Sequence, residues 1–141
     1  MKMYRVKRRE KRLSLFLMFL MIFAAAGCGK KEESVRTDVD FSVITAGEVP
    51  QELAEIIEKN EENEMRLAWK TEDALYLVRG YGKQSSGGYS VAVAECTEDE
   101  EYLWFDTRLI GPQDPDNLSQ EPSYPCLVVK IAPTEKEVII N

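Results

Sequence analysis

The pattern of apolar and polar positions changes sharply near the start of the chain. Seven basic residues and one acidic residue come first, and an apolar run that ends in small residues, "LSLFLMFLMIFAAAGC", follows from Leu13 to Cys28. As a helix, the run from Leu13 to Gly27 would span only about 22 Å, which is short of the roughly 30 Å hydrocarbon core of a bilayer. Basic residues, a short apolar run and small residues in this order are typical of an export signal, not of a permanent membrane helix.

One later segment has the period of a helix. Leu53, Ile56 and Ile57 lie at helical spacing. Pro50 precedes them, and a proline suits the first turn because the N–H it lacks would be unpaired there in any case. The pattern predicts one helix over residues 50–59 with a single apolar face.

Most of the remaining sequence predicts β-strands. Apolar and polar residues alternate over 65–70, which is the period of a strand with one buried face. Residues 74–78 are largely apolar, as expected for a strand covered on both faces. Further apolar or alternating segments lie at 41–44, 89–96, 102–110, 127–131 and 138–140. Short connections favour antiparallel neighbours, so the expected fold class is α+β, a mostly antiparallel β sheet or sandwich with one covering helix.

These patterns predict three consecutive regions. Residues 1–27 form a signal peptide, residues 28–40 a flexible polar tether, and residues 41–141 a single globular domain. The 114 residues that follow the expected signal peptide are enough for one domain, which would bury about two thirds of the surface of its unfolded chain around one core.

The end of the apolar run resembles a bacterial lipobox. In Ala25-Ala26-Gly27-Cys28, small residues precede a cysteine. The resemblance implies cleavage before Cys28 and a diacylglycerol on its thiol, and two acyl chains anchor a protein stably. We therefore expect a lipoprotein on the extracytoplasmic face of the cell membrane, with the covalent lipid on Cys28 and no other cofactor. A plain signal peptide, or an uncleaved anchor with an incidental cysteine, is the alternative.

The charge balance narrows the expected partners. Without residues 1–27 the chain keeps 11 basic and 24 acidic residues, a net charge of −13. Such a surface repels nucleic acid and anionic lipid headgroups, so nucleic acid is not expected as a partner and membrane contact is expected through the lipid alone. An acidic surface also suits a basic protein or a weakly bound cation, although a solvated face is the simpler interpretation.

Few residues suit catalysis or metal binding. The sequence has no histidine, which removes Ser–His and Cys–His pairs and the commonest metal ligand. The acids at 98–101 read as a solvated turn, with weak calcium binding as the alternative, and the segment 114–117 lacks the glycine and terminal glutamate of a calcium loop. We expect neither an enzyme nor a metal site.

Two cysteines follow the lipobox. Export permits a disulfide between Cys96 and Cys126, but neither lies in a dense cysteine framework. Two buried free thiols are therefore the favoured expectation, and a disulfide remains the alternative.

The segment "KQSSGGYSV", residues 83–91, places a lysine near a glycine pair. A phosphate-binding loop needs the lysine after the glycines and a helix behind it, whereas here the lysine comes first and a strand follows. We expect instead a hairpin between two strands, in which the glycines allow positive φ and close backbone approach. These glycines are Gly80, Gly82, Gly87 and Gly88.

Two longer motifs resemble one known family. "VRGYGKQSSGGYSVAVAEC", from Val78 to Cys96, and "GPQDPDNLSQEPSYPCLVVKI", from Gly111 to Ile131, look like the PrcB C-terminal domain family, which pairs a Gly-Gly-Tyr strand opening with a proline loop and a Tyr-Pro before an apolar strand. The resemblance covers about residues 74–131. It implies a non-catalytic role in stabilising or assembling an extracytoplasmic partner. Cys126, directly after Tyr-Pro, departs from the plain hydrophobic residue expected there.

Aromatic residues beside these motifs are the candidate binding residues. Tyr81, Tyr89, Tyr124 and Pro125 are the candidates for contact with a protein partner, because tyrosine is frequent at binding hot spots. Trp69 and Trp104 are expected in the core. The sequence thus predicts a membrane-anchored lipoprotein that acts as a non-catalytic accessory or binding module for a surface protease or another envelope complex. A small-molecule or cation sensor is the alternative.

Overall fold

The computed structural model describes residues 35–114, 116 and 118–141. In this part of the chain, eight strands form two four-stranded sheets. Sheet A has the order β1 (Thr37–Asp38), β5 (Ser90–Glu98), β6 (Tyr102–Ile110) and β8 (Glu137–Ile140). Sheet B has the order β2 (Ser42–Val43), β7 (Cys126–Ile131), β4 (Leu75–Tyr81) and β3 (Glu64–Lys70). The expected signal peptide, residues 1–27, and the expected lipidation site, Cys28, lie outside the described residues.

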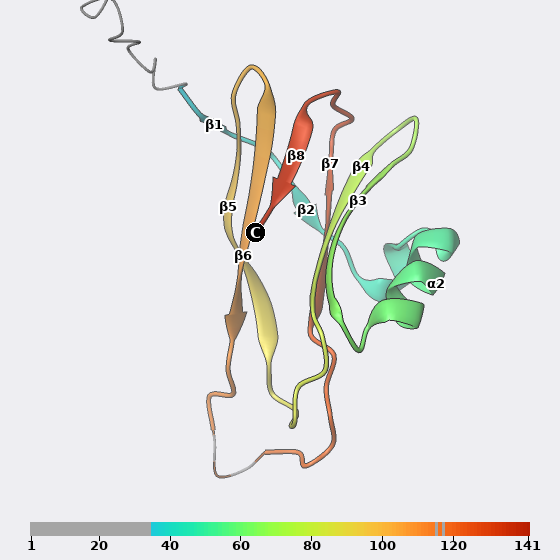
Figure 1. Cartoon of the computed structure of the whole chain (residues 1–141), viewed down its shortest axis with the longest axis vertical. Helices are drawn as coiled ribbons and strands as arrows, with labels where there is room; N and C mark the ends of the chain where they lie inside the picture. Colours follow the sequence, from blue (N-terminus) through green and yellow to red (C-terminus); the bar gives the residue numbers. More distant parts are fainter. Residues whose placement is uncertain (1–34, 115, 117) are drawn as a thin grey trace, which may run out of the picture. The chain divides into compact units, whose positions relative to one another are not determined.

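The two sheets face each other across the main hydrophobic core (Figure 1). Leu77 of β4 and Phe105 of β6 are fully buried there, because alternate residues of each strand point to the same face. The other buried members of this core are Leu75, Cys96, Leu103, Val129 and Ile131. Most strand pairs are antiparallel, so the α+β class with a mostly antiparallel sandwich is confirmed.

The helix α2 (Gln51–Asn60) covers the opposite face of sheet B (Figure 1). Leu53 of the helix is fully buried in a second hydrophobic cluster, which also contains Val78 of β4. Since Leu77 faces the main core and Val78 faces the helix, β4 is covered on both faces, as the apolar run 74–78 predicts.

The ends of α2 lie within one residue of the predicted helix, 50–59. Pro50 occupies the position before the first helical residue, with φ −52°. At the other end, the side-chain amide of Asn60 donates a hydrogen bond to the carbonyl of Ile56 (2.7 Å), one of the carbonyls that a helix end leaves unpaired. In the described ranges, no helix has the length and apolar character needed to cross a bilayer.

The predicted hairpin between β4 and β5 is wrong, because the two strands lie in different sheets. The glycine-rich segment instead carries the chain from sheet B to sheet A. Among the described residues, Gly82 and Gly88 adopt positive φ values of 69° and 86°. A positive φ lets the chain turn sharply, but it does not determine which sheet the next strand joins.

A second departure concerns β8. It pairs with β6 in parallel, with Tyr102 opposite Glu137 and Phe105 opposite Ile140. The chain crosses from β7 in sheet B to β8 in sheet A, so the short-connection rule that favours antiparallel neighbours does not apply to this pair.

The predicted tether, 28–40, is wrong in its last residues. Thr37 and Asp38 form β1 against β5, and the Val39 N–H donates to the carbonyl of Cys96 (2.9 Å). Arg36 makes an ion pair with Glu95 (3.3 Å). Because this segment is polar, its sequence pattern does not predict that it forms an edge strand of sheet A.

Candidate functional site

Two loops at one end of the sandwich are held together. We call residues 82–89 the glycine loop and the described residues of 111–125, which are 111–114, 116 and 118–125, the proline loop; both lie at the bottom of Figure 1. Gln84 and Ser123 exchange two backbone hydrogen bonds (2.8 and 3.2 Å), and the Ser123 hydroxyl donates to the carbonyl of Ser86 (2.6 Å). The two motifs that carry the family resemblance are therefore joined in space.

The glycine pair lies in close contact with the proline loop. A Cβ on Gly88 would stand 3.1 Å from the Cβ of Pro112, and a Cβ on Gly87 would stand 3.1 Å from the Cβ of Ser119. The Gly87 N–H also donates to the Ser119 carbonyl (3.1 Å). The glycines thus allow two loops to pack, which is the close backbone approach that their residue type predicts.

Tyr81 connects the two sheets at this end of the molecule. Its hydroxyl lies 2.8 Å from the hydroxyl of Thr107 in β6, and its ring lies 4.0 Å from the guanidinium carbon of Arg79. Arg79 is only 4% exposed and donates to the carbonyl of Gly80. The hydroxyl and the ring of Tyr81 therefore make contacts within the fold. Nothing in the sequence pattern predicts the burial of Arg79 beside it.

The other three predicted binding residues are half-buried near the same loops. Tyr124 and Pro125 end the proline loop, and the Pro125 carbonyl accepts a hydrogen bond from the Tyr81 N–H (3.0 Å), so the structure brings Tyr81 and Pro125 together. Tyr89 ends the glycine loop. Among the described residues, neither the hydroxyl of Tyr89 nor that of Tyr124 has a hydrogen-bond partner.

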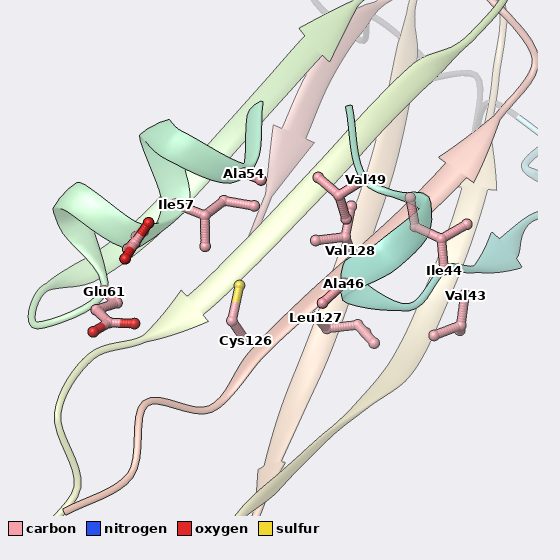
Figure 2. Close-up of a pocket in the computed structure, with 11 residues that line it drawn as sticks. Val43, Ile44, Ala46, Val49, Ala54, Ile57, Glu61, Cys126, Leu127 and Val128 are labelled. Atoms are coloured by element: carbon pink, nitrogen blue, oxygen red, sulfur yellow. The ribbon is translucent and has the colours of Figure 1, made fainter. Parts of the chain in front are cut away.

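A groove lies on the face of sheet B that α2 covers, between α2 and the 3₁₀ helix η1 (Ala46–Glu48). The sequence patterns do not predict this groove. Figure 2 shows its apolar side chains converging from the two helices and from β7. Its volume is about 370 Å³. It is lined by Val43, Ile44, Ala46, Val49, Ala54, Ile57, Glu58, Glu61, Cys126, Leu127 and Val128. We refer to this set as the groove.

The two cysteines are free thiols in different sheets. Cys96 is buried in the main core, which raises its pKa to about 11, with a smaller contribution from Glu98. Cys126 is exposed and presents its sulfur to the groove (Figure 2). Partial burial raises the pKa of Cys126, and the negative charge of Glu61 raises it further. The expectation of two buried thiols therefore holds for Cys96 and is wrong for Cys126.

The two tryptophans have different positions. Trp69 packs against the cluster beneath α2, as expected for a core residue. Trp104 lies on the outer face of sheet A, where the guanidinium carbon of Arg36 stands 3.7 Å from its ring centroid. Its neighbours Leu103 and Phe105 point into the main core, so the alternation of β6 turns Trp104 outward and its predicted core position is wrong.

The acidic turn before β6 is organised by a carboxylate. An oxygen of Asp99 accepts hydrogen bonds from the N–H groups of Glu101 and Tyr102, both at 2.8 Å. Glu98 forms an ion pair with Lys136 (2.9 Å). Within the described residues, no group of three or more acidic, cysteine or histidine side chains has the arrangement of a metal site.

Two facing sheets joined by paired loops, with a helix over one outer face, define a helix-covered β-sandwich. Residues 75–132 match the family described as PrcB C-terminal, which confirms the resemblance predicted for residues 74–131. The match runs from β4 to the residue after β7 and includes both loops. Comparisons with curated proteins and with solved structures found no significant match.

Proposed function

We propose that this protein is a membrane-anchored extracytoplasmic lipoprotein whose β-sandwich acts as a non-catalytic accessory module. We further propose that its partner is a surface protease or another protein complex of the cell envelope. The observation that carries this proposal is the match of residues 75–132 to the PrcB C-terminal family, together with the hydrogen bonds that join the two motif loops.

The proposed anchor is supported by the sequence before the sandwich. A basic cluster, a short apolar run and the small residues ahead of Cys28 occur in the order that export and lipidation require. A lipid on Cys28 would confine the domain near the membrane and so raise its effective concentration for envelope partners. Intact-mass measurement tests this part: we expect loss of residues 1–27 and the added mass of a diacylglycerol, and an uncleaved, unacylated chain would disprove it.

The proposed partner contact is supported by the candidate residues at the loop end. Tyr89 and Tyr124 are half-buried, and among the described residues neither hydroxyl has a hydrogen-bond partner. A tyrosine combines a large apolar ring with a polar tip, which suits a protein interface. Pro125 follows Tyr124 directly and is half-buried, and its carbonyl accepts a hydrogen bond from the Tyr81 N–H.

Crosslinking in the intact cell envelope tests the partner. A photo-crosslinking residue is placed at Tyr89 or Tyr124 in the full-length chain, and Glu100, an exposed residue of the turn before β6, serves as the control position. We expect one protein to be captured repeatedly from the two tyrosine positions and much less from Glu100. Capture of lipids without any recurring protein would contradict the proposal. A small-molecule or cation sensor predicts instead no recurring protein and a raised melting temperature with one ligand of a screen.

A further inference from the structure

Strand β7 has an incompletely covered edge beside the groove. Its neighbour β2 pairs with it only at Ser42 and Val43, and the next hydrogen bond, from the Ile44 N–H to the Val128 carbonyl (3.1 Å), precedes the turn into η1. In an antiparallel strand, alternate residues direct their backbone groups to the same edge, so those of Cys126 face the same way as those of Val128. Among the described residues, no backbone partner is recorded for Cys126 on this edge.

The side chains around this edge are mostly apolar. Val128, Val49 and Ile57, which belong to the cluster beneath α2, contribute aliphatic surface to the groove, and the adjoining Val43 is 56% exposed. A volume of about 370 Å³ falls in the range of sites that enclose a ligand. An open strand edge beside an apolar hollow is the arrangement by which a protein adds an extended peptide to a sheet and takes its alternate side chains into a pocket.

The charge of the groove favours a basic occupant. Glu58 and Glu61 line it near the C-terminal end of α2, where the helix dipole adds further negative potential. No lysine or arginine is among the lining residues. A second copy of this acidic chain would be repelled by these carboxylates, and a lipid acyl chain would leave them without a counter-charge.

We propose that the groove binds an extended segment of a protein partner that carries apolar side chains next to a lysine or arginine. The apolar side chains enter the hollow over β7, the backbone pairs with the open edge at Cys126, and the basic residue meets Glu58 and Glu61. This inference rests on the proposed function, because it adds a second contact surface, outside the loop end, to the same accessory role.

Alkylation of Cys126 tests occupancy of the groove directly. The probe is an eight-residue peptide of alternating leucine and lysine, added to the full-length protein in phosphatidylcholine vesicles, and mass spectrometry follows each thiol. We expect the peptide to slow alkylation of Cys126 at least fivefold, with buried Cys96 as the unreactive internal reference. A leucine–glutamate peptide and a glycine–lysine peptide of the same length are expected to give little protection, because each lacks one of the two required features.

Charge variants separate a specific site from general attraction to an acidic protein. The double variant Glu58→Gln/Glu61→Gln removes both groove carboxylates, and Glu52→Gln/Glu62→Gln removes the same charge from glutamates that do not line the groove. At low salt we expect the first variant to bind the leucine–lysine peptide about fivefold more weakly and the second to bind almost normally, a difference that shrinks as salt is added. Each alkylation rate is compared with that of the same variant without peptide.

A steric variant completes the test. Ala54→Phe places a ring in the groove from α2, and we expect it to abolish protection while thermal unfolding shows an intact fold. Equal protection by all three peptides, or equal loss in both charge variants, would overturn the assignment. If high protein concentration alone protects Cys126, the groove binds a second copy of this chain. If added fatty acid alone protects Cys126, the groove binds a lipid. Either result would also overturn the proposed peptide site. If the envelope partner is still captured with full yield by the Ala54→Phe variant, the groove inference fails while the proposed function stands.

Discussion

The hydroxyl of Tyr81 in β4 lies 2.8 Å from the hydroxyl of Thr107 in β6, and this hydrogen bond joins the two sheets at the end that carries the motif loops. Tyr81 is therefore both a candidate binding residue and a structural one. A substitution that removes the Tyr81 hydroxyl but keeps the ring tests the structural role separately from the binding role.

The first prediction concerns this bond. Tyr81→Phe removes the hydroxyl and keeps the ring against Arg79, so we expect the free energy of unfolding to fall by about 1 kcal/mol. The double variant with Thr107→Val should lose less than the sum of the two single variants, because it leaves neither hydroxyl unpaired. Urea unfolding measures all three changes, and strict additivity would show that the two hydroxyls do not interact.

The second prediction concerns Gly88 in the glycine loop. Gly88 has φ 86°, and a Cβ there would stand 3.1 Å from Pro112, so Gly88→Ala combines backbone strain with a close contact. We expect a loss of about 1–3 kcal/mol in the free energy of unfolding. Gly111→Ala is the matched control, because a Cβ there meets nothing within 4 Å, and it should be neutral or slightly stabilising. Equal effects of the two variants in thermal unfolding would contradict the loop packing.

The third prediction compares two arginines that contact the same carboxylate. Glu64 lies 3.5 Å from Arg79 and 3.4 Å from Arg66, but the side chain of Arg79 is 4% exposed and that of Arg66 is 48% exposed. Arg79→Met leaves the Gly80 carbonyl and Glu64 without this donor and removes the contact with the Tyr81 ring, so we expect a loss of about 2 kcal/mol.

Arg66→Met is the control for this prediction, and we expect it to change the free energy of unfolding by less than about 0.5 kcal/mol because an exposed ion pair contributes little. Chemical denaturation of both variants gives the comparison. Similar losses at the two positions would mean that the burial of Arg79 adds nothing to stability.

The fourth prediction concerns the pH dependence of stability. Burial raises the pKa of Cys96 from its ordinary value of 9.0 to about 11. Between these values the unfolded chain has lost the thiol proton while the folded chain keeps it, so the contribution of Cys96 to stability is complete below pH 9 and is lost as the pH rises towards 11. Cys96→Ala removes this contribution. We expect its stability to fall less steeply than that of the wild type over this range, and parallel curves would contradict the assignment.

The fifth prediction concerns the reactivity of Cys126. Burial and the charge of Glu61 both raise its pKa, so Glu61→Gln should lower the pKa and increase the alkylation rate near pH 8. Glu62→Gln removes a neighbouring charge that is not among the groove residues and should change the rate less. Alkylation kinetics followed by mass spectrometry measure both, and an unchanged rate in Glu61→Gln would show that this carboxylate does not act on the thiol.

The sequence by itself determined the local elements of this protein and its family resemblance. The helical spacing of Leu53, Ile56 and Ile57 placed α2 within one residue, and the apolar run over 74–78 predicted a strand buried on both faces. Such patterns are readable because the side-chain period reports directly which face of an element is buried. The motifs around Gly88 and Tyr124 were sufficient to predict the family match.

Only the tertiary structure decided how the elements meet. The crossing of the glycine loop between sheets, the parallel pairing of β8 with β6 and the edge role of Thr37 all depend on contacts between residues far apart in the chain. The groove has the same origin, since α2, η1 and β7 each contribute one wall. Local periodicity fixes which face of an element avoids water, but the choice of neighbour depends on packing across the whole domain, and no single segment encodes it.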